Sequence, residues 1–559
     1  MTRAPAATAA LDDFFASYYR HRPVSATFIG VHDYDDRLPD LSERGVDDVR
    51  SEMAAIRKRL RALPPEPLTD AEAMDRALAE GFLEIQEWEF ASPHFHRGNP
   101  CVYTGEAVFG VIALFLRDFA PTARRAVAAI ARMAAVPRLL TQGRTNLVAA
   151  PRAWIERAVQ ECIGARAFFQ SGIEALIRQH GIRDPQVHST AAAAAAAFVE
   201  FQSYLETDLG PRGHDTYGCG GEAFALYLRR GHFLGIDAAA VRATAEEQIA
   251  ASEGELASRA GALGAQDWPD ALARLADRHP TADAYHGRFS ELWEAAREAA
   301  LAHDLLTWPD YPLDYRAQPA WARGAAPYLY FLPYRSPAPF DRQAVVDYLV
   351  PPLDPEMPPE EQARRLRAVN ESVIKLNHVA HHGGIGHHVQ NWYAYRAASR
   401  IGQIAAVDCA LRIAMFCGGT MAEGWACYAT DLMDEIGFLS PLEQCAQAHA
   451  RLRQAARAFV DVNLHQGTFT LDEAAAFYQR RVGLAPGAAR AEAVKNSMFP
   501  ATAMMYMVGT RLIHELRREL SARRPGAFDL RRFHDDVLGY GSVPVALISS
   551  AMRTARAYV

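Results

Sequence analysis

Residues 237–264, DAAAVRATAEEQIAASEGELASRAGALG, decide the fold class of this chain. The stretch is rich in strong helix formers, and a glycine lies at its end. Residues 42–63 and 69–90 carry apolar side chains at spacings of three and four, which is typical of amphipathic helices. Residues 189–210 begin at a Ser-Thr pair that we expect to cap a helix, and they stop at Gly210. The sequence predicts a mostly α protein.

Residues 303–360 differ, because prolines and aromatic residues crowd this part of the chain. Prolines at that density exclude a long helix, so we expect a small extended or β insert. The best strand candidate is APYLYFLPY, residues 326–334. We therefore expect an N-terminal helical lobe over 1–300, the insert over 301–360 and a second helical lobe over 361–559.

The composition excludes several classes of protein. The chain has 559 residues, of which 50% are hydrophobic, and its net charge of -7 gives no basic surface for nucleic acid. Its start lacks the apolar core of a signal peptide, and no apolar run is long enough to span a bilayer, so we expect no membrane partner. The seven cysteines are irregularly spaced, which suits a reducing compartment. We expect a cytoplasmic protein; the sequence does not indicate its oligomeric state.

Residues 377–392, NHVAHHGGIGHHVQNW, hold five of the 20 histidines of the chain. We expect the helix that begins near Pro359 to lead into them. His378 and His382 are four residues apart, so they would share one face of that helix and could bind one metal ion. His381 and His388 would lie about 10 Å apart along an unbroken helix, too far for one ion. The three glycines between them favour a break that removes this separation. The alternative is that the histidines cap a helix end.

A carboxylate follows further along the chain. Glu423 lies in the stretch CGGTMAEGWACYATDLMDEIG, residues 417–437, where its neighbours are mostly apolar. Burial of a lone carboxylate is costly, so the side chain needs a partner, a proton or a cation. The alternative is a surface glutamate favoured by the dipole at a helix N-terminus.

The two motifs HHGGIGHHVQ and EGWACYAT resemble those of the bacterial domain-of-unknown-function 885 (DUF885) family. Members of that family carry H-E-x-x-P-G-H-H-x-Q and, later in the chain, E-G-W-A-x-Y-x-E. Residues 23–42 have its P-x-x-A-T-x-x-G pattern, and the likeness continues into the C-terminal third. The family is similar to helical zinc metallopeptidases of the thimet oligopeptidase and carboxypeptidase Taq type. The resemblance implies a large two-lobed helical fold with a deep cleft.

The resemblance also implies a zinc site. By position, His381 is the first ligand, His387 or His388 is the second, and Glu423 is the third. Such a set leaves a coordination position open, as hydrolytic zinc requires. The chain departs from the pattern at the general base, where His382 replaces the glutamate. It departs again at Ile385, which replaces proline, and at Thr430, which replaces the second acid of the EGWA motif.

Four further residues are candidates for the site. Tyr506 could stabilise a developing oxyanion, or it could be a core aromatic residue. His465 and Asp461 are four residues apart, so they would share a helix face, and His465 could serve in catalysis. Arg335 could bind a substrate carboxylate with two parallel hydrogen bonds.

The first hypothesis for function is a metal-dependent hydrolase, with zinc as the cofactor, that cleaves an amide or peptide-like bond in a small molecule or short peptide. Imidazole can take and give protons near neutral pH, so His382 could replace the usual glutamate base. The second is a non-hydrolytic metalloenzyme of the lyase or non-haem iron type, since two histidines and a carboxylate also bind iron or another divalent metal. The third is a metal-binding pseudoenzyme.

Overall fold

The computed structural model describes residues 5–63, 68–329, 332–354, 356–410, 412–555 and 558. Helices dominate these ranges, and the sheet within them has two strands. The prediction of a mostly α protein is confirmed. The chain divides into two compact units, and each draws on several segments of the sequence. Within the described ranges, no helix combines the length and apolarity needed to cross a bilayer.

The first unit comprises residues 1–217, 318–343 and 407–415. Its α-helices, π-helical turns (η1, η2) and one 3-10 turn (η3) are α1 (Pro5–His21), α2 (Pro23–Ile29), α3 (Glu43–Ala62), α4 (Asp70–Ala91), α5 (Cys101–Ile112), α6 (Thr122–Asn146), α7 (Arg152–Ala167), η1 (Phe168–Gly172), α8 (Ile173–His180), α9 (Gln186–Tyr204), η2 (Leu205–Leu209), η3 (Gly210–Arg212) and α14 (Ala320–Arg323).

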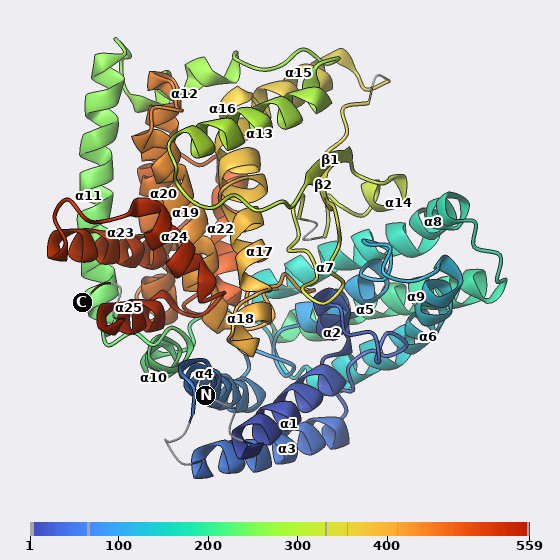
Figure 1. Cartoon of the computed structure of the whole chain (residues 1–559). Coiled ribbons are helices and arrows are strands. Elements are labelled where there is room, and N and C mark those ends of the chain that lie inside the picture. The colour runs from blue at the N-terminus through green and yellow to red at the C-terminus, as the bar shows by residue number, and fades with distance from the viewer. Residues whose placement is uncertain are drawn as a thin grey trace. The chain divides into compact units, whose positions relative to one another are not determined.

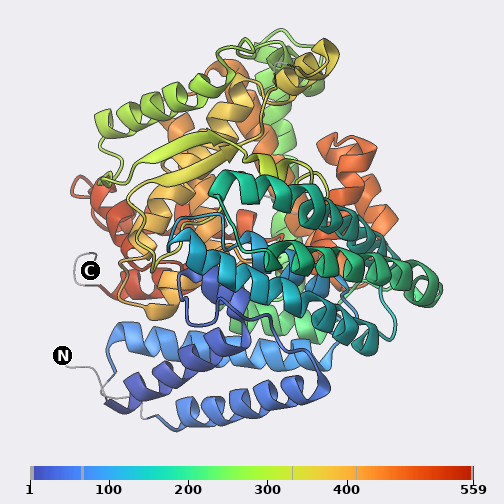
Figure 2. The same ribbon diagram turned by 90° about the vertical axis from the view of Figure 1, so that its right-hand side faces the viewer.

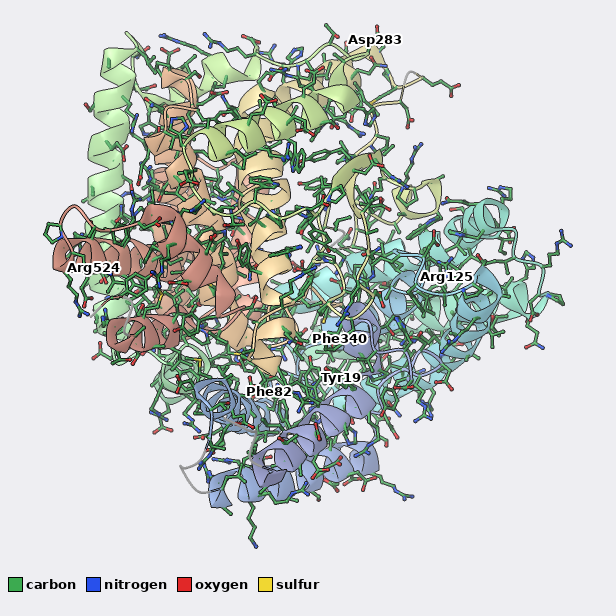
Figure 3. The ribbon with its side chains drawn as sticks, in the orientation of Figure 1. Tyr19, Phe82, Arg125, Asp283, Phe340 and Arg524 are labelled. Carbon is green, nitrogen blue, oxygen red and sulfur yellow. The ribbon has the colours of Figure 1, made fainter. Side chains whose placement is uncertain are left out.

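Aromatic side chains join the N-terminal helices of the first unit. Helices α1, α3 and α4 lie side by side in Figures 1 and 2. Phe82 of α4 packs against Phe14 and Tyr18 of α1, with ring centroids 6.0 and 5.6 Å apart, and Figure 3 shows its side chain among these helices. Such edge-to-face pairs add to the stabilisation from burial of apolar area.

The second unit comprises residues 218–317, 344–406 and 416–559. Its elements are α10 (Gly221–Leu226), η4 (Tyr227–Gly231), α11 (Ala238–Ala262), α12 (Trp268–Ala276), α13 (Tyr285–Ala302), β1 (Leu313–Ala317), β2 (Val346–Val350), α15 (Pro359–Ala368), α16 (Glu371–Val373), η5 (Ile374–Gly383), α17 (His387–Ala394), α18 (Arg400–Ile404), η6 (Phe416–Gly418), α19 (Gly419–Glu435), α20 (Pro441–His465), α21 (Leu471–Phe477), η7 (Tyr478–Val482), α22 (Pro486–Met498), α23 (Met505–Arg523), α24 (Leu530–Gly539) and α25 (Val545–Thr554).

Two long helices form the frame of the second unit. Helix α11 runs along α20 in Figure 1. The side chain of Asp237 caps α11 by accepting the backbone N–H of Ala240. Arg451 of α20 pairs with Glu255 of α11 at 3.0 Å. Helix α20 also packs against α23, which in turn packs against α19, so these helices hold the EGWA segment in place.

The strands lie within the predicted insert but not at the predicted residues. Strands β1 and β2 pair in parallel, with Leu313 opposite Val346 and Tyr315 opposite Tyr348, and Figure 2 shows the two arrows side by side. The strand prediction for 326–334 was wrong: 326–329 form turns and 332–334 are irregular, whereas 330 and 331 lie outside the described residues. The physical reason is that pairing depends on a partner strand, which a local pattern cannot reveal.

Two predicted helix boundaries need correction. Helix α9 begins at Gln186, and Ser189 and Thr190 donate their hydroxyls to its carbonyl, so they lie inside the helix instead of capping it. The helix that begins at Pro359 ends at Ala368, and Asn370 caps a new one by accepting the N–H of Val373. The predicted lobe boundaries at 300 and 360 do not coincide with the two units, since 318–343 belong with the N-terminal helices.

Candidate metal centre

The histidine segment forms a π-helix, η5, followed by a glycine turn. In a π-helix each N–H bonds to the carbonyl five residues earlier, and the N–H of Gly384 does so with Val379 at 2.6 Å. The N–H of Gly386 reaches back to Ala380 at 3.0 Å. A Cβ on Gly386 would lie 2.0 Å from the carbonyl oxygen of His381, so only glycine fits there. This turn returns the chain so that His387 lies beside His381.

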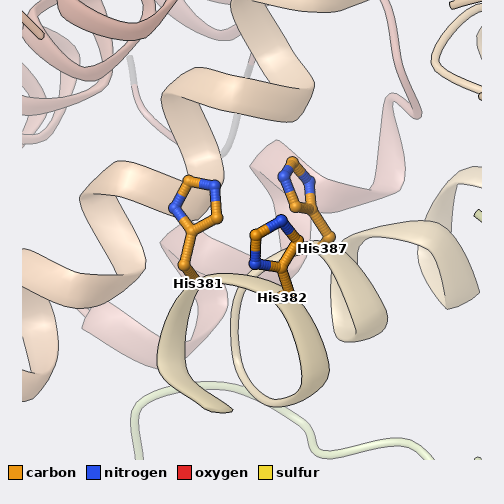
Figure 4. A group of neighbouring side chains, drawn as sticks. All are labelled: His381, His382 and His387. Carbon is orange, nitrogen blue, oxygen red and sulfur yellow. The ribbon is translucent and has the colours of Figure 1, made fainter. Parts of the chain in front are cut away.

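Three imidazoles converge as a result. One ring nitrogen from each of His381, His382 and His387 lies within 4.8 Å of the others, and Figure 4 shows the three rings above the turn. The ring centroids of His381 and His387 are 4.8 Å apart. Six residues of an unbroken α-helix would separate these two residues by about 9 Å along its axis, so the break in the helix has brought them together.

Glu423 joins the cluster from α19. Its Oε2 lies 3.6 Å from Nε2 of His381 and 3.5 Å from Nε2 of His387. This oxygen is buried and has no hydrogen-bond partner among the described residues. Burial raises the pKa of Glu423, but the two imidazoles outweigh burial and hold that pKa well below its usual range. The carboxylate is therefore charged, and its buried Oε2 has no hydrogen bond to compensate for the loss of water.

The distances match those expected between ligands of one metal ion. Two ligand atoms about 2.1 Å from a tetrahedral ion lie about 3.4 Å apart. The two separations between Glu423 and the imidazoles are close to this value and longer than a good hydrogen bond. The side chains of His381 and His387 are 14% exposed and that of Glu423 is 21% exposed, so solvent can reach the cluster.

His382 presents one nitrogen to the cluster and uses the other for support. Its Nδ1 lies 2.7 Å from the carbonyl oxygen of Asn377. Since a carbonyl only accepts, Nδ1 carries the proton and Nε2 carries the lone pair. Burial and the neighbouring imidazoles lower the pKa of His382 well below its usual value, which keeps the ring neutral.

The two remaining histidines of the segment lie outside the cluster. His388 is fully buried, its Nε2 bonds to the carbonyl of Tyr311 at 2.7 Å, and its ring stacks on the Tyr311 ring. His378 bonds through Nδ1 to the hydroxyl of Tyr348 at 2.6 Å. The predicted pairing of His378 with His382 is not found, because His378 is bound to Tyr348 whereas His382 groups with His381 and His387. Of the two alternatives for the second position, the structure brings His387 to Glu423.

Two tryptophans hold the glycine turn in place. Trp425 donates its indole N–H to the carbonyl of Ile385 at 2.9 Å, and Trp293 donates to Gly383 at 2.6 Å. Neither contact was predicted from the sequence. The sequence does contain a signal for Trp425, because this residue belongs to the EGWA motif together with Glu423.

The other predicted site residues have varied surroundings. Tyr506 lies close enough to Glu423 for that charge, together with burial, to raise its pKa well above its usual value. His465 is fully buried; its Nε2 bonds to the carbonyl of Asn496 and its Nδ1 accepts the N–H of Cys219, contacts that favour a structural role. Arg335 belongs to the first unit, where its Nη1 donates to the carbonyl of Cys409 at 2.7 Å.

Asp461 holds the turn that leads into α23. Its two carboxylate oxygens accept the backbone N–H groups of Ala501 and Met504 at 3.1 and 3.0 Å. Burial raises the pKa of Asp461 to about 8. Because α23 begins at Met505, this contact positions the first turn of the helix, and with it Tyr506.

A family model with the description "Bacterial protein of unknown function (DUF885)" matches residues 23–552. The chain belongs to the DUF885 family. No curated protein sequence matches it. Two solved structures are similar to this DUF885 chain over nearly its whole length. One is a candidate lipoprotein of unknown function from Shewanella oneidensis, with 22% identity, a TM-score of 0.77, and coverage of 99% of this chain and 100% of that one.

The other similar structure is a candidate lipoprotein from Colwellia psychrerythraea. It is 17% identical, with a TM-score of 0.76, and the match covers 98% of each chain. At these identities the likeness shows that the DUF885 chain shares their fold. The cytoplasmic location stays a prediction.

Proposed function

We propose that the cluster binds one divalent metal ion, with zinc the expected one, and that the protein is a metal-dependent hydrolase of an amide or peptide-like bond in a small substrate. The main support for the proposal is the buried Oε2 of Glu423, which lacks a hydrogen-bond partner among the described residues. This oxygen lies 3.6 Å from Nε2 of His381 and 3.5 Å from Nε2 of His387. A buried carboxylate in such a position needs a cation. His381, His387 and Glu423 would hold it, and a bound ion there would supply Lewis-acid chemistry.

His382 is the proposed general base. Its neutral Nε2 faces the cluster, and the carbonyl of Asn377 orients the ring through Nδ1. In hydrolysis this nitrogen takes a proton from the attacking water as the carbon–oxygen bond forms. It then gives the proton to the leaving amine nitrogen as the carbon–nitrogen bond breaks. This is the work of the glutamate at the same position in the metallopeptidase pattern.

Tyr506 is the proposed oxyanion donor. No hydrogen-bond partner engages its hydroxyl among the described residues, although its electrostatic coupling to Glu423 indicates that it lies near the cluster. A phenol O–H can donate to the substrate carbonyl oxygen as negative charge develops on it. The raised pKa keeps that proton in place at neutral pH. The deep cleft that the metallopeptidase resemblance implies stays a prediction.

Metal analysis of single variants tests the proposal. We expect the purified protein to bind one zinc ion per chain, measured by plasma mass spectrometry after dialysis against a trace of zinc. His381→Ala, His387→Ala and Glu423→Ala should each lose the metal. His388→Ala is the matched control: it should retain the metal, although it loses the contacts with Tyr311.

Several results would contradict the proposal. If the wild-type protein binds no divalent ion in calorimetry, the site is not a metal centre. If His388→Ala loses the metal and His387→Ala keeps it, the ligand assignment is wrong. If iron copurifies and zinc does not displace it, a redox or lyase reaction replaces hydrolysis as the best-supported function.

A further inference from the structure

Helix α20 carries two arginines that share one carboxylate. Arg453 and Arg457 lie one helical turn apart, and both bond to Glu492 of α22, at 3.1 and 2.7 Å. Two guanidinium groups and one carboxylate leave a net charge of one positive unit. The side chain of Arg457 is 13% exposed and that of Arg453 is 42% exposed, so Arg457 is the inner member of the pair. The remaining positive charge is therefore held partly away from solvent.

Arg457 is fixed in place, but much of its hydrogen-bonding capacity is unused. Its Nε donates to Glu492, and its guanidinium carbon lies 4.7 Å from the centre of the Tyr506 ring. Among the described residues, neither Nη group has a hydrogen-bond partner. Arginine presents five N–H donors in a planar fork, of which only the Nε donor is used here. The two Nη groups are thus available to a ligand.

The guanidinium of Arg457 lies beside the proposed hydrolytic site. Tyr506, on which the guanidinium stacks, is the proposed oxyanion donor. The hydroxyl oxygen of Thr510 lies 2.7 Å from the carbonyl oxygen of Tyr506 and 3.2 Å from that of Gly424, the residue after Glu423. Arg457 is therefore close to the metal centre, but it is not part of it.

We propose that Arg457 binds a carboxylate of the substrate, and that the substrate is a short peptide or acylated amino acid with a free C-terminal carboxylate next to the bond that is cleaved. The planar fork matches the two oxygens of a carboxylate. The net charge of the trio balances one carboxylate but only part of a phosphate. The inference rests on the proposed hydrolase function, because that function places a scissile bond between His382 and Tyr506.

Two substrates that differ in one group test the inference. An N-acyl dipeptide with a free C-terminal carboxylate is compared with the same dipeptide as its C-terminal amide, and kcat/KM is measured with zinc-loaded protein. We expect the wild-type protein to prefer the free acid by roughly 10- to 100-fold, as loss of a charged hydrogen-bonded pair implies. Arg457→Gln should remove that preference by lowering kcat/KM for the acid and leaving kcat/KM for the amide unchanged. Arg457→Lys should retain part of the preference.

Arg453→Gln is the matched control. It removes one positive charge from the same trio but leaves Arg457 on Glu492 and on Tyr506. We expect it to keep the preference for the acid. Equal kcat/KM values for acid and amide in the wild-type protein would overturn the inference while leaving the hydrolase proposal in place. An equal loss for both substrates in Arg457→Gln would also overturn it.

A binding experiment separates this inference from the proposed function. The probe is a non-cleavable dipeptide in which the scissile amide nitrogen is methylated, prepared as the acid and as the amide and titrated by calorimetry. Tighter binding of the acid that depends on Arg457 supports the carboxylate site even if no peptide is hydrolysed. Equal binding of the two forms to the wild-type protein overturns it, whatever the hydrolytic activity.

Discussion

The indole nitrogen of Trp425 and the carbonyl oxygen of Ile385 are 2.9 Å apart and form a hydrogen bond. Trp425 lies two residues after Glu423, and Ile385 lies in the turn between His382 and His387. One contact therefore ties the helix that carries the carboxylate to the loop that positions the imidazoles. The two parts of the site are distant in sequence, and this bond fixes their mutual position.

Trp425→Phe should weaken metal binding while leaving every proposed ligand present. The variant keeps an aromatic ring but leaves the Ile385 carbonyl without its donor. Loss of a supporting contact of this kind typically lowers metal affinity by about 10- to 100-fold. Competition with a zinc chelator measures the change. Trp154→Phe, a buried tryptophan of the first unit, should lower the free energy of unfolding without changing the zinc affinity; equal zinc affinities in the two variants would contradict the prediction.

Gly386→Ala should disrupt the site through the backbone. The new Cβ would lie 2.0 Å from the carbonyl oxygen of His381 and 2.7 Å from that of Ala380. The turn must open to accept it, at a cost of about 1–3 kcal/mol in the free energy of unfolding. Because the opening moves His387 away from Glu423, zinc binding should also be lost. Urea unfolding and metal analysis measure the two effects.

A second glycine provides the control for that experiment. Gly254 lies on the exposed face of α11, and a Cβ there meets nothing within 4 Å. Gly254→Ala should stabilise the protein by about 0.5–1 kcal/mol, since alanine is the better helix former. If Gly386→Ala behaves like Gly254→Ala, the turn is less constrained than the contacts indicate.

His382→Gln should abolish proton transfer but retain the metal. Glutamine can accept a hydrogen bond but cannot take up a proton near neutral pH, so kcat/KM should fall by about 100- to 10,000-fold. His382→Glu should recover activity, because it restores the base of the metallopeptidase pattern. His188→Gln removes an exposed histidine of the first unit and should change neither quantity. Loss of zinc from His382→Gln would instead make His382 a ligand.

Stability should fall in mild acid because of two buried histidines. Burial lowers the pKa of His232 and of His534 to about 4. In the unfolded chain their pKa is about 6.5, so between these values the unfolded chain binds protons that the folded chain excludes. The free energy of unfolding is therefore highest above about pH 6.5, and it falls toward pH 4 by up to about 3 kcal/mol per histidine.

Urea unfolding at several pH values between about 7 and 4.5 measures this dependence. The double variant His232→Gln, His534→Gln should show a shallower slope than the wild-type protein over the same range. It should also be less stable at neutral pH, since His232 bonds to the carbonyl of Ala501 and His534 bonds to Tyr428. Parallel slopes for the two proteins would show that other groups dominate the acid response.

Local signals in the sequence predicted the helices well. Ser42, Thr69 and Asp237 stand at or just before the predicted starts, and each caps its helix as an N-cap residue should. The strands were misplaced because Leu313 pairs with Val346, which is distant in the sequence, and no local pattern encodes that pairing. Helix starts could be predicted from neighbouring residues, whereas the pairing of two strands distant in the sequence could not.

The candidate site was predicted in part. The structure brings together His381, His382, His387 and Glu423, which the motifs had singled out. The choice between His387 and His388 depends on the π-helical turn, which a histidine count does not reveal. Arg457 was missed because it is one of many arginines. Its position four residues before Asp461 was a usable signal, since both lie on the same face of α20.

The backbones of helices α19 and α23 are in direct contact where Gly424 meets Gly509. A Cβ on Gly424 would lie 2.6 Å from the Cα of Gly509, and one on Gly509 would lie 2.0 Å from the carbonyl oxygen of Thr420. Glu423 precedes Gly424 in α19 and Tyr506 lies one turn before Gly509 in α23, so the contact between the two backbones sets the spacing of the helices that carry them. Substitutions elsewhere in the hydrophobic interior can therefore accumulate during divergence without changing the distance between the Glu423 carboxylate and the Tyr506 phenol.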